Sequence, residues 1–86
     1  MSGQIVLFPA AKRIGTIRRW AYTIACYKRV QSQEKVLRHR LNTFAEGLRK
    51  IGFAEDEIAR ETTSLEAAIR REIARLMMAA RAGRLA

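Results

Sequence analysis

The chain has 86 residues, a formal net charge of +9 at pH 7, and 49% hydrophobic residues. A chain of this length forms one small domain, and its core leaves little room for a large catalytic cleft. Its single cysteine cannot form an internal disulfide, and no apolar run reaches the roughly twenty residues that span a bilayer, so the sequence favours a cytoplasmic protein over a secreted or membrane-spanning one.

The first eleven residues, 1–11, show no helical period. Pro9 fixes its own backbone and biases Phe8 toward an extended conformation, so this segment is predicted to be a flexible N-terminal arm. The apolar run from Ile5 to Phe8 could dock on the bundle itself, or on a strand or groove of a partner.

A first helix is predicted over residues 13–29. Large apolar side chains recur there at spacings of three and four, which predicts a core-facing seam. The seam consists of Ile17, Trp20, Ala21, Ile24 and Tyr27. Arg18 and Arg19 fall on the opposite face. Because the indole N–H of Trp20 needs a polar partner, this side chain could be shared between the core and a binding surface.

A second helix is predicted over residues 33–51, after a break at Val30 to Ser32. Ser32 is a suitable N-cap, but no glycine or proline enforces the break, so a helix continuous with the first is the alternative. The predicted seam of this second helix consists of Leu37, Leu41, Phe44, Leu48 and Ile51.

Gly52 and Phe53 mark the next turn. Glycine after the last helical residue accepts the left-handed conformation, and the apolar residue that follows can fold back on the preceding turn. Because so few residues separate the second helix from the third, the two are predicted to pack antiparallel, with Phe53 closing one end of the core.

The longest helix is predicted over residues 54–82, and the fold is organised around it. Its first turn is acidic and its last turns are rich in arginine, as the helix dipole favours, and Gly83 is a suitable stop signal. Its apolar stripe consists of Ile58, Thr62, Leu65, Ile69, Ile73, Leu76 and Ala80. The elements together predict an all-α fold: a three-helix antiparallel bundle with a long C-terminal helix, in one helical domain of residues 12–86.

Helix lengths predict an uncovered end. At 1.5 Å per residue the third helix is about 42 Å long and the second about 30 Å, so the turns around Leu76, Met77, Met78 and Ala80 should overhang the bundle. Methionine adapts to irregular partners, and an exposed apolar patch flanked by arginine is typical of an interaction surface. The same patch could pair two copies of the chain.

The residue types that catalysis and metal binding need are scarce. One histidine and one cysteine cannot supply the four ligands of a structural zinc site. His39, between Arg38 and Arg40, is predicted to be a solvated surface side chain. Because the sequence also lacks a phosphate-binding glycine loop and a calcium loop, we predict no enzyme activity, no cofactor and no metal.

The positive charge favours an acidic partner, either a protein or a phosphate backbone. Between residues 12 and 29 there are six basic residues and no acidic one, whereas from residue 52 onward six arginines meet six acidic residues. A small DNA-binding regulator that contacts phosphates through the first helix is therefore one alternative. The third helix begins with three acidic residues, at the end where a recognition helix would contact bases and phosphates, and this argues against direct recognition of DNA bases.

Several short motifs resemble those of a family of small alpha-proteobacterial helical proteins. They are Ile5-Val6-Leu7-Phe8-Pro9, Lys12-Arg13, Ile17-Arg18-Arg19, Gly52-Phe53 followed by Ile58, and Leu65-Glu66-Ala67-Ala68-Ile69. Within that family the chain is most similar to the QseM-like antiactivators of rhizobial integrative and conjugative elements. The resemblance implies a protein that binds the quorum-sensing TraR-type regulator and the FseA-type excision activator and blocks both, so that conjugative transfer is repressed.

Such a role needs a binding surface and no catalysis. A cationic face, adaptable methionines and a tryptophan would suit a small protein that meets two protein partners. We therefore predict a protein-binding region formed by Phe8, Arg18, Arg19, Trp20, Leu76 and Met77.

Overall fold

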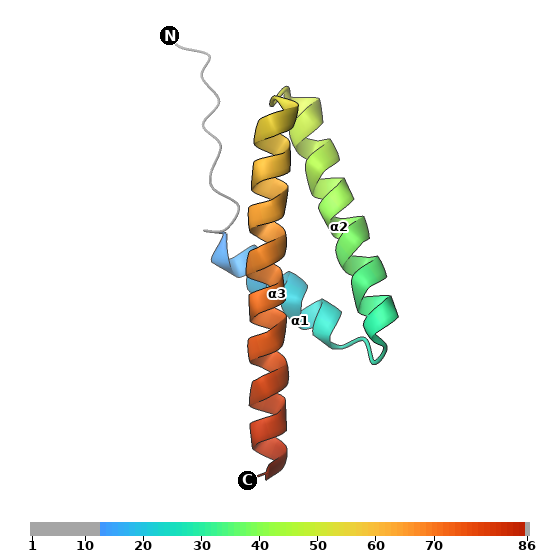
Figure 1. Ribbon diagram of the computed structural model, residues 1–86, viewed down its shortest axis with the longest axis vertical. Helices are drawn as coiled ribbons and strands as arrows, with labels where there is room; N and C mark the ends of the chain where they lie inside the picture. The colour runs from blue at the N-terminus through green and yellow to red at the C-terminus, as the bar shows by residue number, and fades with distance from the viewer. Residues whose placement is uncertain (1–12, 86) are drawn as a thin grey trace.

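The computed structural model describes residues 13–85, and in that range it contains three helices and no strand (Figure 1). They are α1 (Ile14–Ala25), α2 (Val30–Ile51) and α3 (Glu55–Leu85). The predicted all-α fold, with packed helices and a long C-terminal helix, is confirmed. The predicted arm and its Phe8 lie outside the described residues.

Helix α3 packs against both other helices, and α1 and α2 touch each other less. Figure 1 shows α2 and α3 running antiparallel, close together at their shared turn and spread apart at the other end, where α1 crosses behind α3 and spans the gap. Side chains from all three helices meet in one core: Ile17, Ala21, Ile24, Leu37, Leu41, Leu65, Ala68 and Ile69. The predicted seams supply most of it.

The turn between α1 and α2 differs from the prediction. Helix α1 ends at Ala25 and not at residue 29, and α2 begins at Val30, three residues earlier than expected. The continuous-helix alternative is therefore wrong. So is the proposed cap, because Arg29 is the N-cap of α2 and Ser32 lies inside the helix. Tyr27, assigned to the core seam, is 43% exposed because it follows the end of α1.

Packing and one side-chain hydrogen bond account for this early turn. Both Ala21 and Ile24 are fully buried, so the end of α1 is fixed against the core and the chain must reverse to place α2 on the same core. The side-chain amide of Gln33 donates to the carbonyl oxygen of Tyr27 at 2.8 Å, and its backbone N–H donates to the carbonyl oxygen of Arg29. Gln33 thus ties the first turn of α2 to the connection.

The turn between α2 and α3 follows the prediction. Gly52 adopts the left-handed conformation with φ 108°, and the N–H of Phe53 donates to the carbonyl oxygen of Leu48 at 3.2 Å, which closes a Schellman motif. Phe53 is half-buried at this end of the bundle. The seam of α2 ends at Leu48, however, since Ile51 is 55% exposed.

Helix α3 extends through its expected stop. Gly83 lies within the helix, which continues to Leu85, so the predicted stop at Gly83 is wrong. Gly52 alone has a positive φ among residues 13–85. The predicted core stripe is confirmed at Ile58, Leu65 and Ile69, each at most 3% exposed, whereas its last member, Ala80, is exposed.

An ion-pair network joins α2 to α3. Arg70 donates to both carboxylate oxygens of Glu34, at 2.6 and 2.8 Å, and its Nε donates to Glu66 at 2.9 Å. The hydrogen bond from Arg70 lowers the pKa of Glu34 below its ordinary value of 4.5. The pair lies 36 residues apart in sequence, so it links the two helices where they spread.

We expect Glu34→Gln to lower the stability slightly at neutral pH and to have no effect in acid. A carboxyl group with a lowered pKa in the folded state stabilises the protein above the unfolded pKa, and this contribution is lost as the pH falls through the folded pKa. Because the side chains are nearly half exposed, solvent screens the pair and keeps the effect small. We expect the free energies of unfolding of the two proteins, measured by urea denaturation between neutral pH and about pH 2, to converge below pH 4.5.

Glu61→Gln provides the matched control. Glu61 lies on α3 and makes no ion pair with the rest of residues 13–85, so its variant should follow the wild type more closely. If the stability difference between Glu34→Gln and the wild type stays constant down to about pH 2, the carboxylate charge does not stabilise this helix pair.

Candidate functional site

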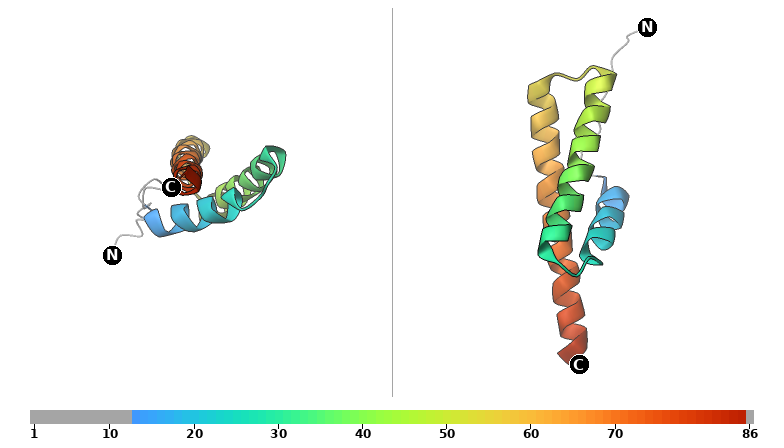
Figure 2. Two further views of the ribbon diagram at one scale, coloured as in Figure 1. Left: turned by 90° about the horizontal axis from the view of Figure 1, so that it is seen from below. Right: turned by 90° about the vertical axis from the view of Figure 1, so that its right-hand side faces the viewer.

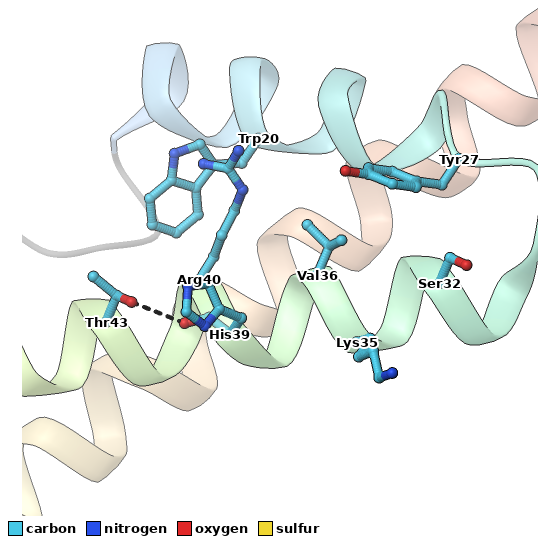
Figure 3. Close-up of a pocket in the computed structure, with 8 residues that line it drawn as sticks. All are labelled: Trp20, Tyr27, Ser32, Lys35, Val36, His39, Arg40 and Thr43. Carbon is cyan, nitrogen blue, oxygen red and sulfur yellow. Dashed lines mark hydrogen bonds between the residues drawn. The ribbon is translucent and has the colours of Figure 1, made fainter.

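A groove of about 800 Å³ lies between α1 and α2 (Figure 3). Two aromatic residues come from α1 and the turn after it, and the other residues come from one side of α2. The lining consists of Trp20, Tyr27, Ser32, Lys35, Val36, His39, Arg40 and Thr43. This groove combines aromatic, aliphatic and basic side chains.

Helical spacing explains why α2 presents these residues together. The core residues Leu37 and Leu41 are four positions apart. Val36 directly precedes Leu37 and Arg40 directly precedes Leu41, so both lie on the neighbouring stripe of the helix. Since α1 crosses beside α2, this second stripe faces the flank of α1 that carries Trp20. Figure 3 shows Val36 and Arg40 pointing toward α1, whereas Lys35 points away from it at the outer rim.

A cation–π contact connects the two walls of the groove. The guanidinium carbon of Arg40 lies 5.5 Å from the centre of the Trp20 ring. A similar contact lies near the start of α1, where the guanidinium carbon of Arg13 is 5.7 Å from the centre of the Phe44 ring. Trp20 is half-buried and packs against the core, so Arg40 covers part of the ring that the core leaves uncovered.

The groove carries positive charge that the rest of the described chain does not neutralise. None of its lining residues is acidic, and within residues 13–85 neither Lys35 nor Arg40 makes an ion pair. The ion pairs of that range involve other arginines: Arg49, Arg70 and Arg75. The groove can therefore accept anionic groups beside an apolar surface.

Comparison with known proteins assigns the chain to a family. A family model described as a family of unknown function, DUF6074, matches residues 1–84. The chain belongs to the DUF6074 family. No curated protein and no solved structure matches it. The groove of this DUF6074 chain therefore has to be interpreted from its own residues.

The predicted contact residues lie on separate faces of the DUF6074 chain. Trp20 lines the groove between α1 and α2. Arg18 is exposed on α1 and does not line the groove. Its charge is one of the causes that lower the pKa of Glu72 on α3, after the hydrogen bond from Arg75. Arg19 is exposed. Trp20 lines the groove and its two basic neighbours do not, so their role in binding stays a prediction.

The overhang of α3 is present, though Leu76 does not belong to it. Figures 1 and 2 show α3 continuing beyond the turn that joins α1 and α2. Met78 is 69% exposed, and Met77 is 47% exposed beside a small hollow that Gln33 also lines. Leu76 is half-buried because it packs against the core. Met77 and Met78 therefore form a second exposed apolar surface, apart from the groove.

The described part of the DUF6074 chain holds no group of three or more histidine, cysteine, aspartate or glutamate residues placed to bind a metal. None of its three helices combines the length and apolar character needed to cross a membrane. Sequence reasoning missed the groove as a site. The sequence feature that could have indicated the groove is the second stripe of α2, from Ser32 to Thr43. Its residues repeat at helical spacing, but most of them are polar.

Proposed function

We propose that this protein is an antiactivator that binds transcriptional activators and blocks their activity. The targets we propose follow from the sequence resemblance: a quorum-sensing TraR-type regulator and an FseA-type excision activator. Through them the protein would repress excision and conjugative transfer of an integrative element. It would act in the cytoplasm, by binding alone.

The groove between α1 and α2 carries this proposal. An antiactivator needs a surface that binds the activator more tightly than the activator binds its productive partners. Trp20 and Tyr27 offer apolar area there, and Arg40 and Lys35 offer positive charge that no described carboxylate neutralises. Tryptophan, tyrosine and arginine are the residue types that dominate the energetics of protein interfaces.

The exposed methionines of α3 support a protein with two targets. Methionine side chains are flexible and polarisable, so one methionine surface can pack against differently shaped partners. Met77 and Met78 are not among the residues that line the groove, which gives the chain two apolar surfaces for two activators or for one large one.

An NMR titration of the isotope-labelled protein at fixed salt tests the proposal. One series adds the soluble activator domain, and a second adds duplex DNA. We expect the activator to shift discrete peaks of the groove or of the end of α3, and DNA to shift none. Saturable shifts with DNA and none with either activator would instead assign phosphate binding through α1 and overturn the proposal.

A charge reversal tests the two arginines of α1 that lie outside the groove. Arg18→Glu combined with Arg19→Glu changes two exposed residues, so the helical circular dichroism spectrum should be retained. If the affinity for the activator falls, this face belongs to the interface. If the affinity is unchanged, the two arginines do not contribute to the interface.

A further inference from the structure

We infer that the groove between α1 and α2 receives an acidic amphipathic helix of the activator, an inference that rests on the proposed function. The occupant is defined by its chemistry: carboxylates along one side and aliphatic side chains at helical spacing along the other. Charge, the aromatic surface and the length of the groove each support this occupant.

Charge complementarity selects an acidic ligand. Lys35 at the rim and Arg40 at the wall make no ion pair with the described residues, and no carboxylate lines the groove. A ligand carboxylate at the rim would meet Lys35 without displacing an existing partner. The guanidinium group of Arg40 stacks on Trp20, and its N–H groups can still donate at the edge of that stack.

The aromatic surface favours a protein ligand over a single-stranded nucleic acid. Base stacking requires an open ring face. The guanidinium group of Arg40 stacks on the half-buried Trp20, so a base would have to displace Arg40 to stack on that face of the ring. The Trp20 ring also forms an apolar surface with Val36 and the 43% exposed Tyr27, and aliphatic side chains can contact this surface.

The length of the groove matches a short helix. From Ser32 to Thr43 the groove follows twelve residues of α2, a span of about 16 Å or three helical turns. Two helices form its walls, and residues 13–85 contain no strand whose edge an extended peptide could join. An amphipathic helix that lies in such a groove contacts it through side chains at positions i, i+3 or i+4, and i+7.

The chain carries its own reporter for this test, because Trp20 is its single tryptophan. The probe is a synthetic peptide of about fourteen residues, capped at both ends, with leucine at helical spacing and glutamate at the other positions. We expect it to change the Trp20 emission saturably. Three comparison ligands are a scrambled peptide of the same composition, a peptide with lysine in place of glutamate, and an oligothymidylate of similar charge.

Paired variants test the assignment to the groove. Lys35→Ala combined with Arg40→Ala should weaken binding of the acidic peptide by about tenfold or more. The control, Arg60→Ala combined with Arg71→Ala, removes the same charge from exposed positions on α3 that line no described hollow, and should change the affinity little. Because Arg40 contacts Trp20, the fluorescence anisotropy of a labelled peptide provides a second readout.

The outcomes distinguish this inference from the proposed function. If the activator binds while the acidic peptide neither binds nor competes with it, the groove inference is overturned and the proposed function stands. If the peptide binds in the groove and neither activator binds the protein, the proposed function fails while the ligand chemistry of the groove stands. Equal affinity for the scrambled peptide, or higher affinity for the oligonucleotide, would overturn the inference.

Discussion

Ile69→Ala is expected to lower the free energy of unfolding by about 2–5 kcal/mol. Ile69 is fully buried on α3, in the core cluster where Ile24 from α1 and Leu37 from α2 also lie. Removing its larger side chain leaves a cavity that three separate helices would have to close. Since a domain of this size has a net stability of only a few kcal/mol, a large fraction of the variant should be unfolded at room temperature.

Thermal and urea denaturation followed by circular dichroism measure this loss. Met78→Ala is the matched control, since it shortens an apolar side chain on the same helix at a position that is 69% exposed. It should change the stability by no more than about 0.5 kcal/mol. Similar losses for both variants would mean that the exposed end of α3 is covered in solution, as it would be in a dimer.

The parts of the fold that were predicted correctly depend on local chemistry. The stripe from Ile58 to Ile69 repeats at helical spacing, and the turn at Gly52 needs only a glycine in the left-handed conformation and the apolar Phe53 after it. Neither feature depends on where the rest of the chain lies, so the sequence alone was sufficient to locate α3 and its antiparallel pairing with α2.

The boundary between α1 and α2 could not be predicted in the same way. No glycine or proline lies between Ala25 and Val30, and the apolar spacing continues through Tyr27, so local rules extend the helix. The chain turns there because Ile24 is fixed in the core and Gln33 bonds back to the Tyr27 carbonyl. These are tertiary contacts, and the helical period contains no information about them.

The candidate site was predicted only in part for the same reason. Trp20 was predicted to be a core residue that a binding surface could share, but its partner Arg40 lies twenty residues further along the chain. Their contact depends on how α1 crosses α2. Arg18, two residues before Trp20 in the sequence, does not line the groove between these two helices. A one-dimensional pattern can identify such residues but cannot determine which of them share a face.

Gly52→Ala is expected to destabilise the protein by about 1–2 kcal/mol through the backbone alone. At φ 108° the backbone of residue 52 lies where residues with a side chain are strained. Among the described atoms nothing lies within 4 Å of the position that a Cβ would occupy, so no steric clash contributes. Because this residue closes the turn between α2 and α3, the variant has to strain the turn or open its hydrogen bonds.

Gly47→Ala isolates that effect, because the substitution is the same and the surroundings are equally open. Gly47 lies inside α2, where alanine is more stable than glycine by about 0.5–1 kcal/mol. Both substitutions reduce the conformational freedom of the unfolded chain equally. A lower urea midpoint for Gly52→Ala than for Gly47→Ala therefore reports the cost of placing alanine in the left-handed conformation at residue 52. Gly52→Asn should lose less stability than Gly52→Ala, since asparagine tolerates the left-handed conformation better. Equal losses for asparagine and alanine would instead indicate that a side chain at residue 52 is excluded for another reason.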